Sequence, residues 1–310
     1  MSLRVIFMGT PDFAVPCLEK LCAEHEVIAV ITQPDKPRGR GQKLVPSPVK
    51  VCALAKGIEV LQPVKVKDAE FVEIIRGLQP DLMVVVAFGQ ILSQALLDIP
   101  RLGCINVHGS LLPRYRGAAP MQWCLINGEQ KTGVTTMQMD AGLDTGDMLL
   151  KAELELTPEM NLEQVHDSLS LLGADLLLKT IDGLTAGEIV PQKQNDDESC
   201  YSPMINKALC RIDWTQSAET IHNKVRALDS WPGAFTELDG KVYKIWRTRA
   251  LAEAATLEPG TVTGLTKNGF TVATGQGTLE VLELQAPNKK RMQAAAYLRG
   301  HSLPEQACFK

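Results

Sequence analysis

Short apolar segments alternate with amphipathic helical patterns over the first ninety residues, and this rhythm constrains the fold more than any other feature. The apolar segments cover 3–8, 27–32 and 81–88. The helical patterns cover 11–23, 47–56 and 68–77. Strands that alternate with helices form βαβ units, whose crossover connections place the strands parallel to one another. We therefore expect an α/β, Rossmann-like domain with a mainly parallel sheet, in which Thr10 and Pro11 begin the first helix.

The turn after the first apolar segment lacks the glycines that dinucleotide binding needs. Gly9 is the only glycine there, whereas the fingerprint G-x-G-x-x-G uses three to bring the chain close to a pyrophosphate. The sequence therefore lacks the motif that usually indicates NAD or FAD binding. Ligands of open α/β sheets bind at the carboxyl ends of the strands, so the chemistry is expected where a later strand ends.

The second half of the chain has a different pattern. Asn161 and Gln164 form a capping box before a leucine-rich helical stretch, and another helical pattern covers 217–228. Asn268-Gly269 favours a tight hairpin between two short β-type runs. These runs lie at 241–247, 260–265, 270–273 and 278–284. Short antiparallel runs of this kind predict a smaller β-barrel.

Length and charge both divide the chain. Because 310 residues exceed the usual size of one core, we expect two domains, separated by the polar stretch around 192–199. The expected boundaries are 1–190 for the first domain, 191–206 for a linker and 207–310 for the second domain. Residues 205–310 carry 14 Lys/Arg and 10 Asp/Glu, whereas residues 1–204 carry 18 and 26. A basic second half beside an acidic first half suggests that one part meets a polyanion while the other does chemistry.

Composition excludes several classes of protein. No apolar run reaches the roughly 18 residues of a membrane span, and the first residues lack a secretory cleavage pattern. The eight cysteines form no C-x-x-C pair, and histidines at metal-ligand spacing do not accompany them. We expect a soluble, cytoplasmic protein with reduced cysteines and no metal.

Two polar side chains follow the apolar run 102–105. Asn106 and His108 are two residues apart, so in an extended strand both project from the same face. When an amine attacks a formyl carbon, negative charge grows on the carbonyl oxygen, and fixed N–H donors such as these stabilise it. A carboxylate from the glycine-rich segment 140–147 can take the proton of the amine or orient the imidazole. The residues predict acyl transfer to an amine by direct attack, through a tetrahedral oxyanion.

Two alternatives bear on this interpretation. The segment 140–147 offers Asp140, Asp144 and Asp147, and their spacing alone does not choose among them. A covalent route has little support, because Ser110 has no obvious His/Asp relay and no cysteine lies in a nucleophile-elbow motif.

These motifs carry a resemblance to a known family. Asn106, His108 and Asp144, together with 110–113 and 143–147, resemble the core of the folate-dependent formyltransferases. The segments 7–13, 33–41 and 284–290 resemble the members of that family that formylate methionyl-tRNA. The resemblance spans essentially the whole chain. It implies that Asp144 is the catalytic carboxylate. It also implies that the second domain has an OB-like fold and binds tRNA.

The resemblance also implies substrates and contacts. It implies that the formyl donor is 10-formyltetrahydrofolate and that the acceptor is the amino group of initiator methionyl-tRNA. The reaction would support translation initiation, and the enzyme would act as a monomer. The residues implied to contact folate are Phe88, Gly89, Gln90, Ile91, Leu92, Ser110, Leu111, Leu112, Pro113, Asp140 and Gly142. The basic residues implied to contact tRNA are Lys36, Arg38, Arg40, Lys43, Lys289, Lys290 and Arg291. Their charge suits phosphate oxygens.

Other functions remain open at this point. The same constellation serves formyl transfer to a small amine, such as a glycinamide ribonucleotide or an amino sugar nucleotide, and a hydrolase that releases formate. The basic loop at 35–43 and the second domain argue against a small acceptor. An RNA-binding module without catalysis and a nucleotide-binding oxidoreductase are the alternatives from other classes.

Overall fold

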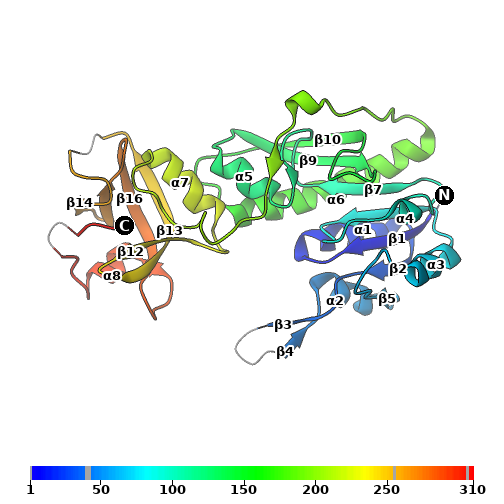
Figure 1. Cartoon of the computed structure of the whole chain (residues 1–310), viewed down its shortest axis with the longest axis horizontal. Coiled ribbons are helices and arrows are strands. Elements are labelled where there is room, and N and C mark those ends of the chain that lie inside the picture. The colour runs from blue at the N-terminus through cyan, green and yellow to red at the C-terminus, as the bar shows by residue number, and fades with distance from the viewer. Residues whose placement is uncertain (1, 39–42, 254–255, 305–306) are drawn as a thin grey trace. The chain divides into compact units, whose positions relative to one another are not determined.

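The computed structural model describes residues 2–38, 43–253, 256–304 and 307–310 (Figure 1). The chain forms two compact units. The first unit comprises Met1–Ala118, Lys131–Glu155 and His166–Ser202. The second unit comprises Ala119–Gln130, Leu156–Val165 and Pro203–Lys310. Two short stretches from within residues 1–190 therefore belong to the second unit.

The first unit is built on a seven-stranded sheet with the order β10-β9-β7-β6-β1-β2-β5. Its strands are β1 (Arg4–Gly9), β2 (Glu26–Ile31), β5 (Val60–Leu61), β6 (Leu82–Val86), β7 (Cys104–His108), β9 (Lys131–Gln138) and β10 (Met148–Glu155). The pairs from β5 to β7 are parallel, and β9 and β10 add an antiparallel edge. The predicted mainly parallel sheet is confirmed. All five residues of β6 are buried, as expected for a parallel strand covered on both faces.

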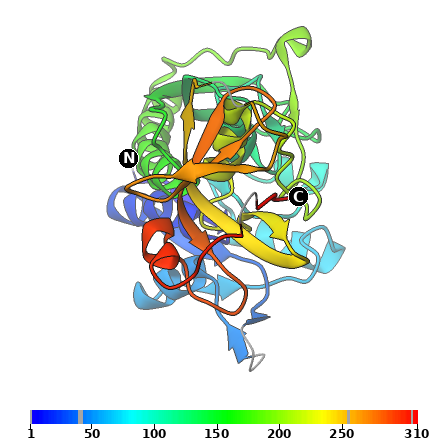
Figure 2. The same cartoon turned by 90° about the vertical axis from the view of Figure 1, so that its left-hand side faces the viewer.

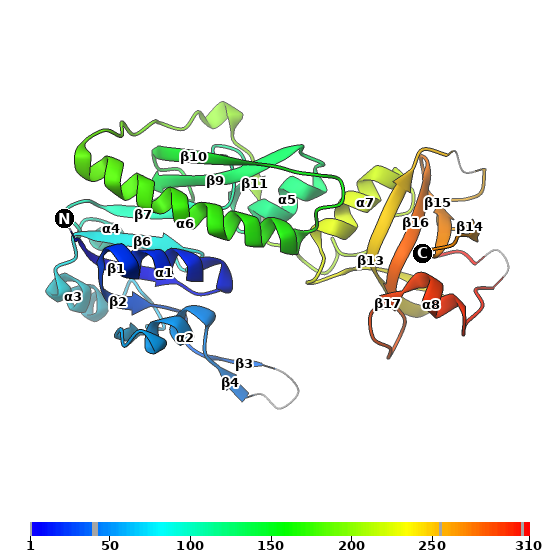
Figure 3. The same cartoon turned by 180° about the vertical axis from the view of Figure 1, so that it is seen from behind.

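Helices cover both faces of this sheet. They are α1 (Val15–Glu24), α2 (Pro48–Ala55), α3 (Ala69–Leu78), α4 (Gln94–Leu97) and α6 (Leu162–Ala186). Figure 3 shows α1 and α6 lying over one face. On the other face, Val72 of α3 and Leu96 of α4 share a hydrophobic core with Ile6 and Met83 of the sheet. Two short strand pairs complete this unit: β3 (Lys36–Arg38) with β4 (Lys43–Val45), and β8 (Arg116–Gly117) with β11 (Tyr201–Ser202).

One predicted helix start is wrong and one is confirmed. A 3-10 turn, η1 (Asp12–Ala14), precedes α1, and the hydroxyl of Thr10 donates to the Phe88 carbonyl at 3.1 Å instead of capping a helix. At α6 the capping box is present. The Asn161 side chain accepts from the Gln164 amide at 3.0 Å, and the Gln164 side chain accepts from the Asn161 amide at 3.1 Å.

The second unit contains an antiparallel sheet with the order β12-β13-β16-β15-β14, and β17 pairs with β16. Its strands are β12 (Ala234–Leu238), β13 (Lys241–Leu251), β14 (Val262–Leu265), β15 (Phe270–Ala273), β16 (Thr278–Gln285) and β17 (Met292–Gln293). Its helices are α5 (Pro120–Ile126), α7 (Ala218–Ala227) and α8 (Ala294–Leu298), and a 3-10 turn, η2 (Asp196–Glu198), lies in the segment that leads to it. The predicted helix at 217–228 is confirmed, because Ser217 caps α7 by accepting from the Thr220 amide.

The Asn268-Gly269 connection differs from the predicted tight turn. β14 and β15 are antiparallel neighbours, but four residues, 266–269, join them, and the Thr266 hydroxyl accepts from the amides of Asn268 and Gly269. A Cβ on Gly269 would lie 2.0 Å from the Val281 carbonyl oxygen. Glycine is needed there for a close approach of two chain segments rather than for a left-handed turn.

The C-terminal residues close the gap between the two edge strands of this sheet. Lys310 exchanges two backbone hydrogen bonds with Glu237 of β12. On the other side, the Val262 amide of β14 donates to Ala307, and the Phe309 amide donates to Gly260. Closure removes exposed edges, and it makes the sheet barrel-like. Figure 2 views this unit with the C-terminal segment running beside its strands.

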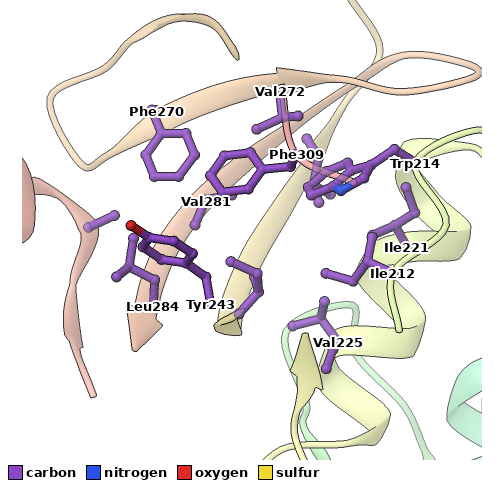
Figure 4. Packing of buried hydrophobic residues seen from close by; sticks show 14 of the residues in the cluster. Ile212, Trp214, Ile221, Val225, Tyr243, Phe270, Val272, Val281, Leu284 and Phe309 are labelled. Atoms are coloured by element: carbon purple, nitrogen blue, oxygen red, sulfur yellow. The ribbon is translucent and has the colours of Figure 1, made fainter. Parts of the chain in front are cut away.

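Phe309 anchors this closure in the core (Figure 4). Its side chain is 3% exposed. Its ring centroid lies 5.9 Å from that of Phe270 and 6.0 Å from those of Tyr243 and Trp214. Aromatic contacts of this kind add to the energy of burial. None of the helices formed by the described residues has the length and apolar character needed to cross a membrane.

Replacing Phe309 with alanine is expected to lower the free energy of unfolding of the second unit by about 3–5 kcal/mol, because removing a buried aromatic ring leaves a cavity in the core. All four tryptophans lie in that unit, so tryptophan fluorescence during urea unfolding reports on it. The control is Cys308→Ser at the neighbouring exposed position, expected within about 0.5 kcal/mol of the parent protein. Equal midpoints for the two variants would contradict this account of closure.

Candidate functional site

Strand β7 places Asn106 and His108 on one face at its carboxyl end. The strand lies between β6 and β9, and the pairs Asn106–Met137 and His108–Thr135 fix its register against β9. Asn106 is 9% exposed and His108 is 6% exposed. The two side chains are therefore held in a nearly dry environment, in which hydrogen bonds and charges act more strongly than in water.

A backbone carbonyl fixes the tautomer of His108. The Nε2 atom lies 2.9 Å from the carbonyl oxygen of Tyr115. A carbonyl can only accept, so Nε2 carries the hydrogen and donates it. The other nitrogen, Nδ1, is then an acceptor in the neutral ring, and it donates only when the ring is protonated. The sequence analysis predicted that an imidazole N–H of His108 would donate to the oxyanion. Because Nε2–H is used on Tyr115, only the protonated ring has an N–H at Nδ1 for this purpose.

The carboxylate of Asp144 contacts both side chains. Its Oδ1 accepts from Asn106 Nδ2 at 3.4 Å, and its Oδ2 lies 3.7 Å from His108 Nδ1. The amide of Asn106 has two hydrogens, so one remains for another acceptor. Asp140 instead accepts from the Gly142 amide at 3.0 Å and from the Thr145 hydroxyl at 2.8 Å, which stabilises the loop. The structure thus brings Asp144 to the two residues of β7.

Asp144 has a left-handed backbone conformation with φ of 53°. Its Oδ2 accepts from the Gly117 amide at 2.8 Å. Gly117 has φ of 111°, and a Cβ there would lie 2.5 Å from the Tyr201 ring and 2.9 Å from the Ser202 carbonyl oxygen. The pairing of β8 with β11 therefore builds the donor that receives the carboxylate.

Sequence reasoning missed this donor and the Tyr115 carbonyl. Every residue has a backbone carbonyl and every residue except proline has a backbone N–H, so no residue type marks the ones that reach a site. It also missed Gln194, whose side-chain amide donates to the carbonyls of Asp144 and Gly146. Gln194 lies in the polar stretch that was interpreted as the way into a linker, and only its contacts distinguish it.

Cys104, at the start of β7, does not offer a nucleophile. Burial raises the pKa of its thiol to about 12, with a smaller contribution from Asp98. A cysteine of this kind stays a thiol at neutral pH and packs as a small apolar side chain. Cys104 therefore gives no support to a covalent route.

Comparison with known proteins agrees with this arrangement. The chain matches the family model described as formyl transferase over residues 3–181, and the model described as formyl transferase, C-terminal domain, over residues 204–302. The chain belongs to the formyl transferase family. A methionyl-tRNA formyltransferase from Trichlorobacter lovleyi is 56% identical over 97% of this chain and 95% of its own length. Another from Clostridioides difficile is 49% identical over 97% of this chain and 98% of its own. The resemblance drawn from the motifs is confirmed.

Solved structures share the fold of this formyl transferase. The sugar 3N-formyl transferase WlaRD has a TM-score of 0.69 and 21% identity, covering 94% of this chain and 100% of its own. HypX from Aquifex aeolicus, solved with tetrahydrofolic acid, has a TM-score of 0.65 and 18% identity, covering 96% of this chain and 47% of its own. At this level of identity the likeness concerns the fold alone.

The residues of this formyl transferase that were implied to contact folate divide into buried and exposed sets. Phe88 and Leu92 are buried in the core with 2% and 3% exposure, so only their backbone can meet a ligand. The Gln90 side chain accepts a hydrogen bond from the Val66 amide and donates one to the Pro63 carbonyl. Ile91 is 71% exposed. The positive φ angles of Ala87 (47°) and Gly89 (86°) turn the chain at the end of β6.

The other implied folate residues divide in the same way. Ser110 is fully buried and donates to the Arg114 carbonyl at 2.7 Å. Leu112 and Pro113 are buried and Leu111 is half-buried, whereas Asp140 and Gly142 are exposed. Side chains that a ligand can reach are therefore few, and backbone groups provide the remainder.

The residues of this formyl transferase that were implied to contact tRNA lie in both units. Lys36 and Lys43 are exposed on the β3–β4 hairpin. Arg38 pairs with Lys43 in that hairpin, and Arg40 lies outside the described residues. In the second unit, Lys289 and Lys290 are exposed. Arg291 differs, because its guanidinium is 2.6 Å from Asp229 and 2.7 Å from Glu283.

Replacing Gly117 with alanine is expected to reduce the rate of formyl transfer at least about tenfold, since the new Cβ displaces the donor to Asp144. The control is Gly187→Ala. Gly187 has a similar left-handed φ of 70° but nothing within 4 Å of an added Cβ. We expect that variant to lose only about 1 kcal/mol of stability and to keep its rate. Equal rates for both variants would remove the Gly117 donor from the mechanism.

Proposed function

We propose that this chain transfers a formyl group from 10-formyltetrahydrofolate to the free amino group of methionyl initiator tRNA, and so supports translation initiation. Similarity along nearly the whole chain to methionyl-tRNA formyltransferases, at 56% and 49% identity, carries this proposal. The cluster of Asn106, His108 and Asp144 at the carboxyl end of β7 supplies groups suited to that chemistry.

The first step is attack of the neutral α-amine on the formyl carbon. The carbonyl oxygen becomes negative while the nitrogen becomes positive. In this proposal, the second hydrogen of the Asn106 amide donates to this oxyanion. Because Asn106 is packed in β7 and bonded to Asp144, the donor is already oriented before the charge develops.

The imidazole of His108 handles the proton. Its Nδ1 accepts the proton that the amine sheds after attack, which makes an imidazolium beside the carboxylate of Asp144. That N–H can then donate to the oxyanion. The proton next passes to the N10 nitrogen of the folate as the tetrahedral intermediate collapses. The products are the formylated amine and tetrahydrofolate, and the imidazole is neutral again.

Asp144 acts chiefly as an orienting and charge-balancing group in this scheme. Its Oδ2 already accepts a hydrogen bond from the Gly117 amide, and its Oδ1 accepts one from Asn106. A carboxylate held in this way stabilises the imidazolium without moving. Of the two roles considered from the sequence, base or orienter of His108, we propose the second.

The tRNA contacts are proposed for basic residues of both units. Lys36 and Arg38 belong to β3 and Lys43 to β4, and Arg40, which lies outside the described residues, falls between them in the sequence. In the second unit, Lys289 and Lys290 suit phosphate oxygens. The ion pairs of Arg291 with Asp229 and Glu283 favour a structural role for that residue over the predicted tRNA contact.

We further propose that the protein works as a monomer in the cytoplasm, where its charged tRNA substrate is made. Gel filtration with light scattering tests the monomer.

One incubation separates this function from the others. The protein is mixed with radiolabelled formyl-folate, charged initiator tRNA and, in parallel, small amines such as an amino sugar nucleotide. Label on the tRNA supports the proposal. Label on a small amine, label released as formate, or no transfer would instead favour the small-amine enzyme, the hydrolase, or a protein without this catalysis.

Replacing Asn106 with alanine is expected to lower turnover by about a hundredfold or more, as loss of an oxyanion donor does. Rates at saturating substrates measure this, and folate affinity is measured separately. The control is Asn206→Ala at an exposed position of the second unit. Near-normal turnover in the Asn106 variant would exclude that side chain from the mechanism.

Replacing Arg40 with alanine is expected to raise the KM for charged tRNA by about tenfold, equivalent to one charge-assisted contact, and to leave folate affinity unchanged. The slope of the logarithm of the tRNA binding constant against the logarithm of the salt concentration should also become shallower by about one. The control is Lys56→Ala, an exposed lysine at the end of α2. Weaker folate binding with unchanged use of tRNA would overturn the assignment of this loop.

A further inference from the structure

Gln194 lies in the segment between the two regions that match the family models, residues 3–181 and 204–302. Its neighbours are polar and mostly exposed, whereas Gln194 is half-buried within the first unit. Its side-chain nitrogen donates to the carbonyl of Asp144 at 2.8 Å and to that of Gly146 at 2.8 Å. Both hydrogens of the amide are thus used on the loop that carries Asp144.

A third partner fixes the orientation of this amide. The oxygen of Gln194 accepts from Arg116 Nε at 2.9 Å. Carbonyl oxygens only accept and a guanidinium only donates, so one orientation of the amide satisfies all three partners. Arg116 is itself held, because its Nη2 donates to Asp196 at 2.8 Å and its side chain is 12% exposed.

The loop of Asp144 needs such a restraint. Asp144 has a left-handed backbone with φ of 53°, which residues other than glycine adopt infrequently. The side-chain bonds of Asp140 to Gly142 and Thr145 stabilise the first part of the loop. Gln194 binds the carbonyls on both sides of Thr145, and so fixes the backbone from which the Asp144 carboxylate projects.

We propose that Gln194 is a positioning residue for formyl transfer, which acts by holding Asp144 beside His108. Arg116 keeps its amide in the required orientation. This inference rests on the proposed function. It assigns a catalytic consequence to the segment that joins the two matched regions, since that segment completes the support of the catalytic carboxylate.

The test compares Gln194→Ala with Gln192→Ala. Gln192 is exposed, lies two residues away, and bonds Met148 only through its backbone. Formyl transfer to charged tRNA is measured at saturating substrates. We expect kcat to fall about tenfold for Gln194→Ala, with unchanged KM for tRNA and folate, and to stay within about twofold for Gln192→Ala.

A nearly isosteric variant separates donation from packing. In Gln194→Glu, the nitrogen becomes an oxygen that faces two carbonyl oxygens, so its loss of kcat should equal or exceed that of the alanine variant. Wild-type kcat in Gln194→Glu would show that only the volume of the side chain matters, which overturns the proposal.

A double-mutant cycle separates an effect through Asp144 from general damage. In the background of Asp144→Asn, adding Gln194→Ala should change kcat by less than about twofold, because the group that Gln194 positions has already been lost. The same tenfold loss in both backgrounds would overturn the proposal.

Amide hydrogen exchange provides a readout that does not depend on activity. The Gly117 amide donates to the Asp144 carboxylate, so its protection should fall about tenfold in Gln194→Ala and stay unchanged in Gln192→Ala. Equal protection would overturn the inference. Failure of the wild-type protein to formylate tRNA would instead overturn the proposed function, and the exchange comparison would still decide whether Gln194 positions Asp144.

Discussion

The approach of the Asp144 carboxylate to His108, 3.7 Å between Oδ2 and Nδ1, is the contact on which the proposed chemistry depends. The sheet supplies one partner, because the register of β7 against β9 fixes the imidazole. The other partner comes from a loop with a left-handed backbone, so it needs external support. The Gly117 amide and the Gln194 side chain give that support. In the proposed mechanism, catalysis depends on a carboxylate held in a fixed position, at a site with little water to screen its charge.

In each unit, backbone hydrogen bonds from a short segment complete a structure built mainly by residues far away in the sequence. In the first unit, backbone groups of short strands β8 and β11 present a donor to the carboxylate. In the second unit, the backbone of Phe309 and Lys310 joins the two edges of the antiparallel sheet, and the Phe309 ring fixes this closure in the core. In both cases a short segment that is distant in sequence completes the structure. Such segments cost chain entropy, which the buried contacts offset.

Much of the frame could be predicted from the sequence, because apolar periodicity reports directly on burial. The βαβ rhythm, the capping box at Asn161 and the shared face of Asn106 and His108 follow from local rules. The start at Thr10 did not, since a 3-10 turn precedes α1. Asp144 could be separated from its neighbouring aspartates only by family resemblance. The Tyr115 carbonyl, the Gly117 amide and the C-terminal closure had no side-chain signal, because they are backbone contacts between distant segments.

The central claim is that His108 and Asp144 act as one unit, and a double-mutant cycle on these two residues tests it most directly. Single-turnover rates of formyl transfer to charged tRNA are measured for His108→Ala, Asp144→Asn and the double variant. If the carboxylate works by holding and balancing the imidazole, the double variant should be slower than the His108 variant by no more than about threefold. If the two losses multiply, each residue acts independently, which contradicts the coupling of His108 and Asp144.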